Sequence, residues 1–224
     1  MNILVLDCAV SKLSIAVKTD TKFISTTYDI GMRQSEILVP SIDEILKKSE
    51  ITAADLNYTA LTIGPGSFTG LRLGISALKA IELAYNVPIY GISSLKVYEY
   101  PYSDVNMPII SCIDANKDKF YAHISEAKTE LLEDGDWEVS TIIDTVKSFE
   151  KVLICGPDAE KLAEIIKEQN KNIEILLPKV QAQTTESLVK LTEELIANGK
   201  PTLKDFDGPV YLRASEAEIK LNEK

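Results

Sequence analysis

ALTIGPGSFTGLRLGI, residues 60–75, and KVLICGPDAEKLAEII, residues 151–166, share one layout. Each runs from an apolar strand pattern through a Gly-Pro pair into a helical pattern. A second correspondence precedes each stretch, because residues 2–19 and 108–125 both read as an apolar strand ending in an aspartate, a polar turn and another strand. Two correspondences in the same order indicate an internal duplication, and the sequence therefore predicts two related α/β lobes with mixed sheets.

We place the first lobe at 1–104 and the second at 105–224, with a Pro- and Tyr-containing segment at the boundary. In the first lobe, the pattern predicts three strands, an amphipathic helix over 34–48, a strand, a helix over 68–85 and a last strand. A helix over 185–198 is expected to complete the second lobe. The tail beyond it has no clear period, and its return to the first lobe stays open.

Composition narrows the function classes. The chain has 224 residues, 45% of them hydrophobic, and a formal net charge of -10. Such a charge disfavours binding of RNA by this chain alone. No apolar run approaches the roughly 20 residues that span a bilayer, and MNILVLDCAV lacks the features of a secretory signal, so we expect a cytoplasmic protein. Cys8, Cys112 and Cys155 share no metal-type spacing and are expected to be reduced and buried.

A duplicated lobe with an aspartate closing its first strand resembles the actin-like ATPase superfamily, whose lobes have the RNase H-like fold. In that superfamily, glycines in the two hairpin turns let the backbone wrap nucleotide phosphates. Here the turns DCAVSK and DANKDK contain no glycine, and Asp118 would repel a phosphate. We therefore expect the architecture without a nucleotide or another cofactor bound by this chain alone.

The glycine-rich stretch fits none of the familiar catalytic motifs. Leu71 follows Gly70 where a phosphate loop needs a lysine, and the glycine spacing is one residue too long for a dinucleotide fingerprint. Ser67 follows Gly66 directly, unlike the serine of a nucleophile elbow. His123 is the one histidine, which excludes a two-histidine metal site and weakens a Ser-His hydrolase. The sequence predicts no catalytic residue and no metal site.

A tight strand-to-helix turn fits this stretch better. Glycines permit unusual dihedral angles, proline rigidifies, and Ser67 or Thr69 caps the helix. Gly70 and Gly74 then lie on one face, which indicates close approach by a neighbour. That neighbour is either a partner protein or another element of the same lobe, with the helix over 34–48 as the intramolecular candidate. The predicted structural turn comprises Gly64, Pro65, Gly66 and Ser67.

IGPGSFTGLRLGISALKAI resembles the signature of the TsaB (YeaZ) family, and LDCAVSKLSIAV, RQSEILVPSIDEIL, GISSL, CIDANKDKFYAHI and PVYLR resemble its other blocks in order. The resemblance implies a non-catalytic subunit of the bacterial machinery that installs threonylcarbamoyl on the adenosine beside the anticodon of tRNAs reading A-starting codons. Its implied partners are TsaD, the metal-binding catalytic paralogue, and TsaE, a small ATPase. ATP and metal would belong to these partners, tRNA would be met only indirectly, and the chain alone would form a homodimer. Cys8-Ala9 replaces the usual Thr-Ser, and Gln34 replaces a common histidine.

The resemblance also implies that the first two long helices form the docking surface. A stand-alone actin-like ATPase or kinase is the alternative function, and a peptidase is a third. The missing hairpin glycines disfavour the former, and the absent nucleophile-base pair disfavours the latter. The candidate interface residues are Leu38, Ile42, Ile45, Gly70, Arg72, Gly74, Ala77 and Ile81.

Overall fold

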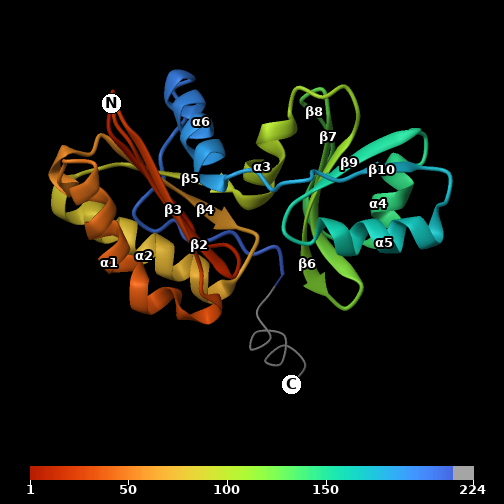
Figure 1. Ribbon diagram of the computed structural model, residues 1–224, viewed down its shortest axis with the longest axis horizontal. Helices are drawn as coiled ribbons and strands as arrows, with labels where there is room; N and C mark the ends of the chain where they lie inside the picture. The colour runs from red at the N-terminus through yellow and green to blue at the C-terminus, as the bar shows by residue number, and fades with distance from the viewer. Residues whose placement is uncertain (214–224) are drawn as a thin grey trace. The chain divides into compact units, whose positions relative to one another are not determined.

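The computed structural model of the chain describes residues 1–213 (Figure 1). The chain divides into two compact units. The first unit comprises Met1–Pro101 and Ala182–Pro209, and the second comprises Tyr102–Gln181 with the described residues 210–213. The chain therefore leaves the first unit after Pro101, returns to it at Ala182 and leaves it again after Pro209.

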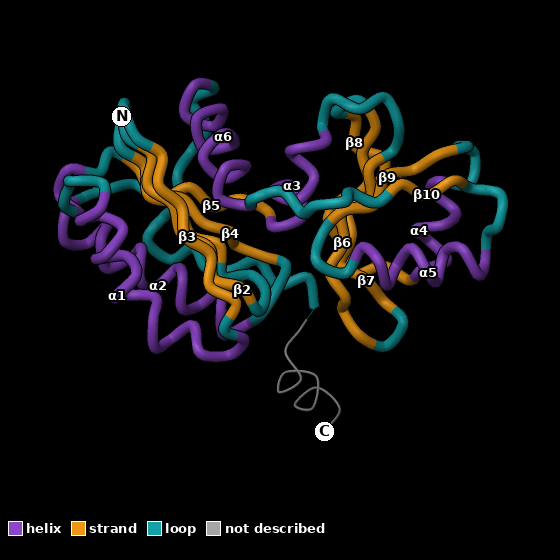
Figure 2. Tube along the Cα trace, in the orientation of Figure 1, coloured by secondary structure: helices purple, strands orange, loops and turns teal. Residues whose placement is uncertain are grey.

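The first unit is one mixed sheet with helices on both faces (Figure 2). Its strand order is β3-β2-β1-β4-β5, in which β1 to β3 are antiparallel and β4 and β5 run parallel to β1. The elements are β1 (Ile3–Asp7), β2 (Lys12–Lys18), β3 (Phe23–Asp29), η1 (Gly31–Arg33), α1 (Gln34–Lys48), η2 (Ala53–Asp55), β4 (Tyr58–Gly64), α2 (Phe68–Tyr85), β5 (Ile89–Ser93), α3 (Ser94–Glu99), η3 (Tyr100–Tyr102, beginning here and ending in the second unit) and α6 (Thr184–Ala197).

The second unit repeats this plan. Its strand order β10-β9-β6-β7-β8 is that of the first sheet read from the other edge, again with an antiparallel meander and two parallel strands. The elements are β6 (Ile109–Asn116), β7 (Lys119–Glu126), β8 (Thr129–Glu138), α4 (Val139–Val146), β9 (Lys151–Cys155), α5 (Ala159–Gln169) and β10 (Glu174–Leu176). The predicted fold class, two duplicated α/β lobes with mixed sheets, is confirmed.

Each sheet buries apolar side chains beneath helices. In the first unit, α1 and α2 cover one face, where Leu38 and Leu78 are buried against strand residues such as Leu13. Helix α6 covers the other face through Leu188 and Val189. In the second unit, α4 and α5 cover one face of the sheet. A hydrophobic layer on each side fixes the positions of β1 and α2, which carry the residues considered below.

The placement of α6 differs from the sequence expectation. Its sequence position suggests the second lobe, but the helix packs on the first sheet, and the first unit resumes at Ala182. The physical reason lies in the face of the first sheet that α1 and α2 do not cover. This face carries buried apolar residues such as Val5 and Ile92, and α6 supplies their apolar cover. Residues 182–209 thus return to the first unit, and residues 214–224 of the tail lie outside the described residues.

Within residues 1–213, none of the helices combines the length and apolar character needed to span a bilayer.

Candidate functional site

The turn between β4 and α2 presses against the β1–β2 hairpin. Gly64 and Gly66 have φ angles of 124° and 158°, a region that side chains rarely adopt. A Cβ atom at Gly66 would lie 2.3 Å from the carbonyl oxygen of Ala9. The Ser67 backbone N–H donates to that same oxygen at 2.7 Å, and the Ser67 hydroxyl accepts the Gly70 N–H at 3.3 Å. Of the two expected caps, Ser67 fills the role at the start of α2.

The glycine face of α2 is directed inward. A Cβ atom at Gly70 would lie 2.1 Å from the carbonyl oxygen of Cys8, and one at Gly74 would lie 3.2 Å from the Cys8 Sγ. The side chain of Leu61 on β4 follows at 3.5 Å from Gly74. These glycines therefore bring α2 close to the end of β1 in the same unit. The expectation that they form a smooth docking face is corrected, since the chain itself covers them.

The expected interface residues of α1 are also buried. Leu38, Ile42 and Ile45 are 0%, 8% and 3% exposed and belong to the core between the sheet and its helices. Their burial in the core disfavours direct contact with a partner, and their assignment to an interface stays a prediction. On α2, Arg72 is exposed, and its guanidinium carbon lies 5.6 Å from the centre of the Phe68 ring. Ala77 and Ile81 on the same helix are partly buried.

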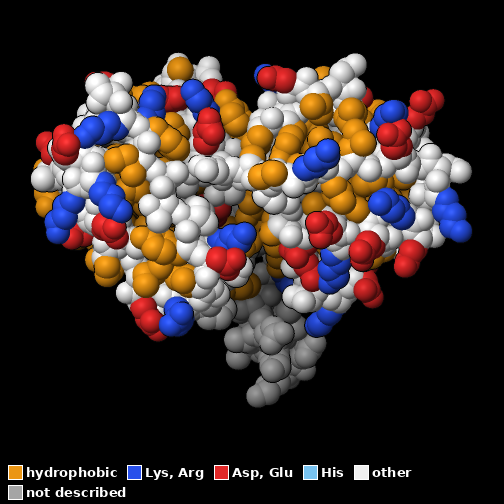
Figure 3. Space-filling model, in the orientation of Figure 1, with side chains coloured by type: hydrophobic (Ala, Val, Ile, Leu, Met, Phe, Trp, Pro, Cys, Tyr) orange, Lys and Arg blue, Asp and Glu red, His pale blue; other side chains and the backbone are white. Residues whose placement is uncertain are grey.

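Other side chains of α1 and α2 do reach the surface. Val39 is 65% exposed, Leu83 is 88% exposed and Tyr85 is 51% exposed. Hydrophobic side chains are visible among charged ones over the part of the molecule where α1 and α2 lie (Figure 3). Sequence reasoning missed these three because it selected the most regular apolar stripe, which is the stripe that packs inward. We refer to Val39, Leu83 and Tyr85 as the outer helix surface.

A buried carboxylate closes β1. The Asp7 Oδ1 atom accepts the Ala9 backbone N–H at 3.1 Å and the Thr62 hydroxyl at 2.9 Å. Burial raises the pKa of Asp7, and hydrogen bonds from Ala9, Thr184 and Thr62 oppose that rise. Asp7 thus joins the hairpin to β4 and to the start of α6 within the first unit.

Gln34, at the first position of α1, closes the same hairpin from the side. Its Nε2 atom donates to the carbonyl oxygens of Val10 and Lys12, at 2.6 Å and 3.3 Å. Sequence analysis noted Gln34 only as a departure from a family pattern and assigned it no contact. The hairpin turn that wraps phosphates in actin-like ATPases is therefore tied here by the chain's own side chains.

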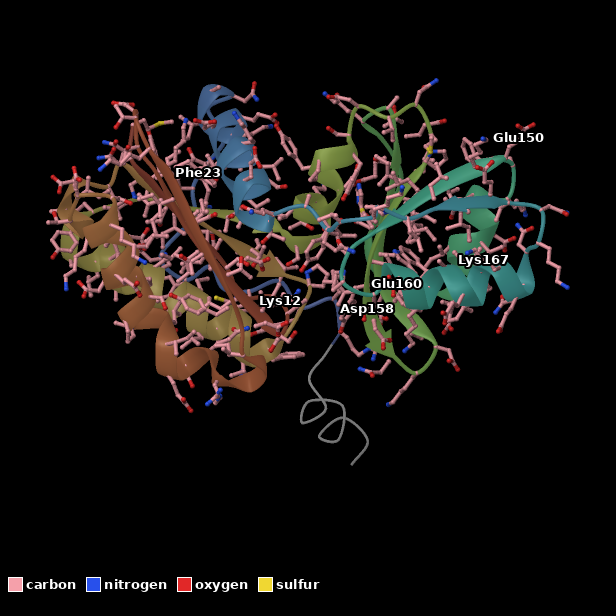
Figure 4. All side chains as sticks on the ribbon, viewed as in Figure 1. Lys12, Phe23, Glu150, Asp158, Glu160 and Lys167 are labelled. Carbon is pink, nitrogen blue, oxygen red and sulfur yellow. The ribbon has the colours of Figure 1, made fainter. Side chains whose placement is uncertain are left out.

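The matching hairpin of the second unit is closed by an ion pair. The Asp114 Oδ2 atom lies 2.5 Å from the Lys161 Nζ atom, and Oδ1 accepts the Asn116 N–H at 2.9 Å. Burial raises the pKa of Asp114, but the hydrogen bonds from Lys161 and Asn116 outweigh it, so the net pKa is lowered. Asp158 and Glu160 lie at the start of α5 (Figure 4), where negative charge disfavours an incoming phosphate.

The residues considered for hydrolysis have other contacts. Ser67 caps α2, and the His123 Nδ1 atom on β7 lies 2.9 Å from the Asp134 Oδ1 atom on β8. The three cysteines are buried thiols, and desolvation raises the pKa of Cys8 and Cys112. In the part of the chain that the structure describes, no group of three or more His, Cys, Asp or Glu side chains is arranged to hold a metal ion.

Solved structures with this fold define the class of protein. YeaZ from Pseudomonas aeruginosa matches with a TM-score of 0.73 and 18% identity, over 94% of this chain and 99% of that one. An inorganic polyphosphate/ATP-glucomannokinase from Arthrobacter matches with a TM-score of 0.51 and 10% identity, over 88% of this chain and 99% of that one. At such identities the likeness concerns the fold, which is that of the actin-like ATPases.

Sequence comparison gives the family. A sequence model of TsaD, described as tRNA N6-adenosine threonylcarbamoyltransferase, matches residues 31–220. The match covers most of the chain, which therefore belongs to this family.

Individual relatives refine the resemblance. The tRNA threonylcarbamoyladenosine biosynthesis proteins TsaB of Escherichia coli and Bacillus subtilis are each 26% identical to the chain, over 99% and 98% of it and over 98% and 97% of their own lengths. A TsaB of Buchnera aphidicola is 34% identical, but the match spans 42% of this chain and 45% of that protein. The resemblance to TsaB (YeaZ) proteins, predicted from the sequence, is confirmed.

Proposed function

We propose that this chain is a non-catalytic scaffold and activator subunit in the formation of threonylcarbamoyladenosine on tRNA, acting with TsaD and TsaE. The observation that carries the proposal is the end-to-end match to proteins named for the biosynthesis of this nucleoside. The match to TsaD itself spans 66% of this chain and 45% of the Bacillus subtilis enzyme, at 29% identity. The matches that run from end to end are to the TsaB proteins and not to the transferase, which favours an accessory role.

The β1–β2 and β6–β7 hairpins, which wrap nucleotide phosphates in actin-like ATPases, are both occupied by contacts of the chain's own side chains, and this supports the non-catalytic part of the proposal. Asp7 and Gln34 tie the first hairpin, and Lys161 neutralises Asp114 beside the second. ATP and metal would then be held by the partners rather than by this chain alone. The net charge of -10 favours a partner, rather than this chain, as the main contact of tRNA.

The outer helix surface, Val39, Leu83 and Tyr85, supports the partner-binding part. Large apolar side chains at such exposure mark interaction sites when they lie close together on one surface, and α1 and α2 pack side by side. This surface would bind TsaD in the complex and a second copy of the chain when TsaD is absent. Arg72, Ala77 and Ile81 lie on the same helix as Leu83 and Tyr85, whereas the glycine face is turned toward β1.

Reconstitution tests the function. Purified TsaD and TsaE, with substrates and unmodified tRNA, should modify the tRNA efficiently only when this chain is added. Ser67→Ala and His123→Ala should leave that activity within a few-fold of the unchanged chain, because neither residue is expected to take part in chemistry. A loss of about 10²-fold, the scale of a missing general acid or base, would overturn the non-catalytic role, as would equal modification without the chain.

A surface variant tests the docking site. Leu83→Glu places a charge on a side chain that is 88% exposed, so the monomer should melt normally while binding to TsaD is lost. Val180→Glu is the matched control, since Val180 is 81% exposed on the second unit. Sizing and calorimetry with TsaD measure both. Wild-type affinity of the Leu83→Glu chain would show that the outer helix surface is not the interface, while leaving the assignment of function intact.

A further inference from the structure

The segment that follows α6 in the first unit contains a turn at residues 204–207, and an aromatic residue lies at its tip. Phe206 is 100% exposed, compared with 88% for Leu83 on the outer helix surface. The flanking residues Asp205 and Asp207 are exposed as well. The ring therefore makes no packing contribution to the first unit, and its whole apolar surface is available to a partner.

Two hydrogen bonds close this turn. The Lys204 backbone N–H donates to the Asp207 Oδ2 atom at 2.7 Å, and the Asp207 N–H donates to the Lys204 carbonyl oxygen at 3.1 Å. Gly208 follows, and nothing lies within 4 Å of an added Cβ atom there. The turn thus presents Phe206 on a constrained backbone, which lowers the entropy cost of ordering this residue in a complex.

The residue before the turn is anchored in the core of the first unit. The Leu203 N–H donates to the Ile89 carbonyl oxygen on β5 at 2.8 Å, and the Leu203 side chain packs against the core beneath α1 and α2. The side chain fits because Gly91 leaves room for it: a Cβ atom at Gly91 would lie 2.9 Å from the Leu203 Cδ2 atom. The position of the turn is therefore fixed relative to the first sheet.

A lysine of α2 joins the turn to the helix that carries the outer helix surface. The Lys79 Nζ atom donates to the Lys204 carbonyl oxygen at 2.8 Å and lies 2.7 Å from the Glu82 Oε2 atom. Leu83 follows Lys79 by four residues, so the two side chains are neighbours on one face of α2. The turn is therefore continuous with the face of α2 that carries Leu83.

We infer that Phe206 is an aromatic anchor that enters an apolar pocket of TsaD and extends the interface of the outer helix surface, an inference that rests on the proposed function. Aromatic side chains buried in a partner's pocket supply much of the binding energy of protein interfaces. Asp205 and Asp207 flank the ring and outnumber Lys204 in the turn. Electrostatic complementarity therefore calls for a basic rim around the pocket.

Calorimetry with purified TsaD and the full chain tests the anchor. Phe206→Ala should weaken binding at least about tenfold, because a buried aromatic contact is lost. Its melting temperature should stay unchanged, since the ring is fully exposed in the free chain. Phe206→Leu, which keeps an apolar side chain, should retain more affinity. Phe23→Ala on β3 is the matched control, because it removes the same ring from a 43% exposed position of the same unit and should bind TsaD like the unchanged chain.

A charge reversal tests the rim of the pocket. Asp205→Lys should slow association with TsaD, most strongly at low salt, where charges on a rim act at longer range. Faster association of this variant would show that the rim is not basic and would overturn that part of the inference.

The outcomes separate the anchor from the proposed function. If the unchanged chain and Phe206→Ala bind TsaD equally tightly, the anchor is overturned while the proposed function stands. Equal weakening by Phe206→Ala and Phe23→Ala would also overturn it, because the effect would not belong to the tip of the turn. If the unchanged chain does not bind TsaD at all, the proposed docking is overturned and the anchor with it.

Discussion

The two units end their first strands in corresponding aspartates, Asp7 and Asp114, that have opposite electrostatic surroundings. Asp7 is buried among neutral donors, and its pKa is raised. Asp114 is partly exposed, pairs with Lys161, and its pKa is lowered. Duplication preserved the position of the carboxylate at the end of the strand, while each unit closed its hairpin with different chemistry. The same residue type at equivalent positions therefore need not have the same role.

The helices that follow the two Gly-Pro turns extend this comparison. In α2, Gly70 and Gly74 allow the helix to approach Cys8 more closely than a Cβ atom would permit. In α5, the buried small residues are Ala159 and Ala163. Helix α2 therefore has glycines where its strand leaves no room for a Cβ atom, and we expect it to tolerate less change there.

The largest effect is expected for Gly70→Ala. The added methyl group would overlap the backbone carbonyl of Cys8, so the free energy of unfolding should fall by roughly 1 to 3 kcal/mol or more. The reverse change in the second unit, Ala163→Gly, should cost only about 1 kcal/mol through helix propensity. Urea denaturation measures both.

A glycine in open surroundings is the control. Gly208 has nothing within 4 Å of an added Cβ atom, so Gly208→Ala should change stability by no more than about 0.5 kcal/mol. If Gly70→Ala were as mild as Gly208→Ala, the close approach of α2 to β1 would be disproved.

Removal of the two aspartates should give the next effect. Asp7→Ala leaves the Ala9 N–H and the Thr62 hydroxyl without their buried acceptor, at a cost of roughly 1 to 3 kcal/mol. Asp114→Ala breaks a pair in which the Lys161 side chain is 54% exposed, so about 1 kcal/mol or less is expected. Thermal melting under identical conditions ranks the two variants. A larger loss of stability for Asp114→Ala than for Asp7→Ala would contradict the expectation that the buried aspartate contributes more than the partly exposed one.

The smallest effect is a difference in pH dependence. The raised pKa of Asp7 means that its contribution is fully present below its unfolded pKa, near 3.8, and is lost as pH rises through the folded value. The lowered pKa of Asp114 means that its contribution is fully present above 3.8 and is lost as pH falls through the folded value.

Stability measured from pH 3 to 7 checks these signs. As pH rises, the unchanged chain should lose stability relative to Asp7→Asn and gain stability relative to Asp114→Asn. Parallel curves for the two variants would show that the aspartates experience similar surroundings.

Local patterns in the sequence predicted much of the fold. The helix expected over 34–48 is α1, and the helix expected over 68–85 is α2, because period and capping residues act over a few neighbouring positions. The duplication was visible because strand, turn and helix recur in one order. β8 and α4 were missed, since their acidic and short segments give weaker periodic signals.

The candidate site was predicted less well. Two glycines on one helix face indicate that something approaches closely, but the pattern does not identify the neighbour, and here the neighbour is Cys8. Leu38, Ile42 and Ile45 form an apolar stripe on α1, and here the stripe is buried. A docking helix shows the same stripe, so the sequence pattern alone does not distinguish the two. The opposite pKa shifts of Asp7 and Asp114 depend on tertiary contacts that are distant in sequence, such as that of Lys161.

The return of α6 to the first sheet has a consequence for synthesis on the ribosome. Chains emerge from the N-terminus, at about 5 to 20 residues per second, and domains usually fold in that order. Here the strands of the first sheet emerge early, yet Val5, Ile92 and their neighbours on one face wait for Leu188 and Val189. Every residue of Tyr102–Gln181 is made in the meantime. The unit that begins first is therefore completed only after residues 102–181 of the other unit have been made, and one apolar face of its sheet stays uncovered until α6 arrives.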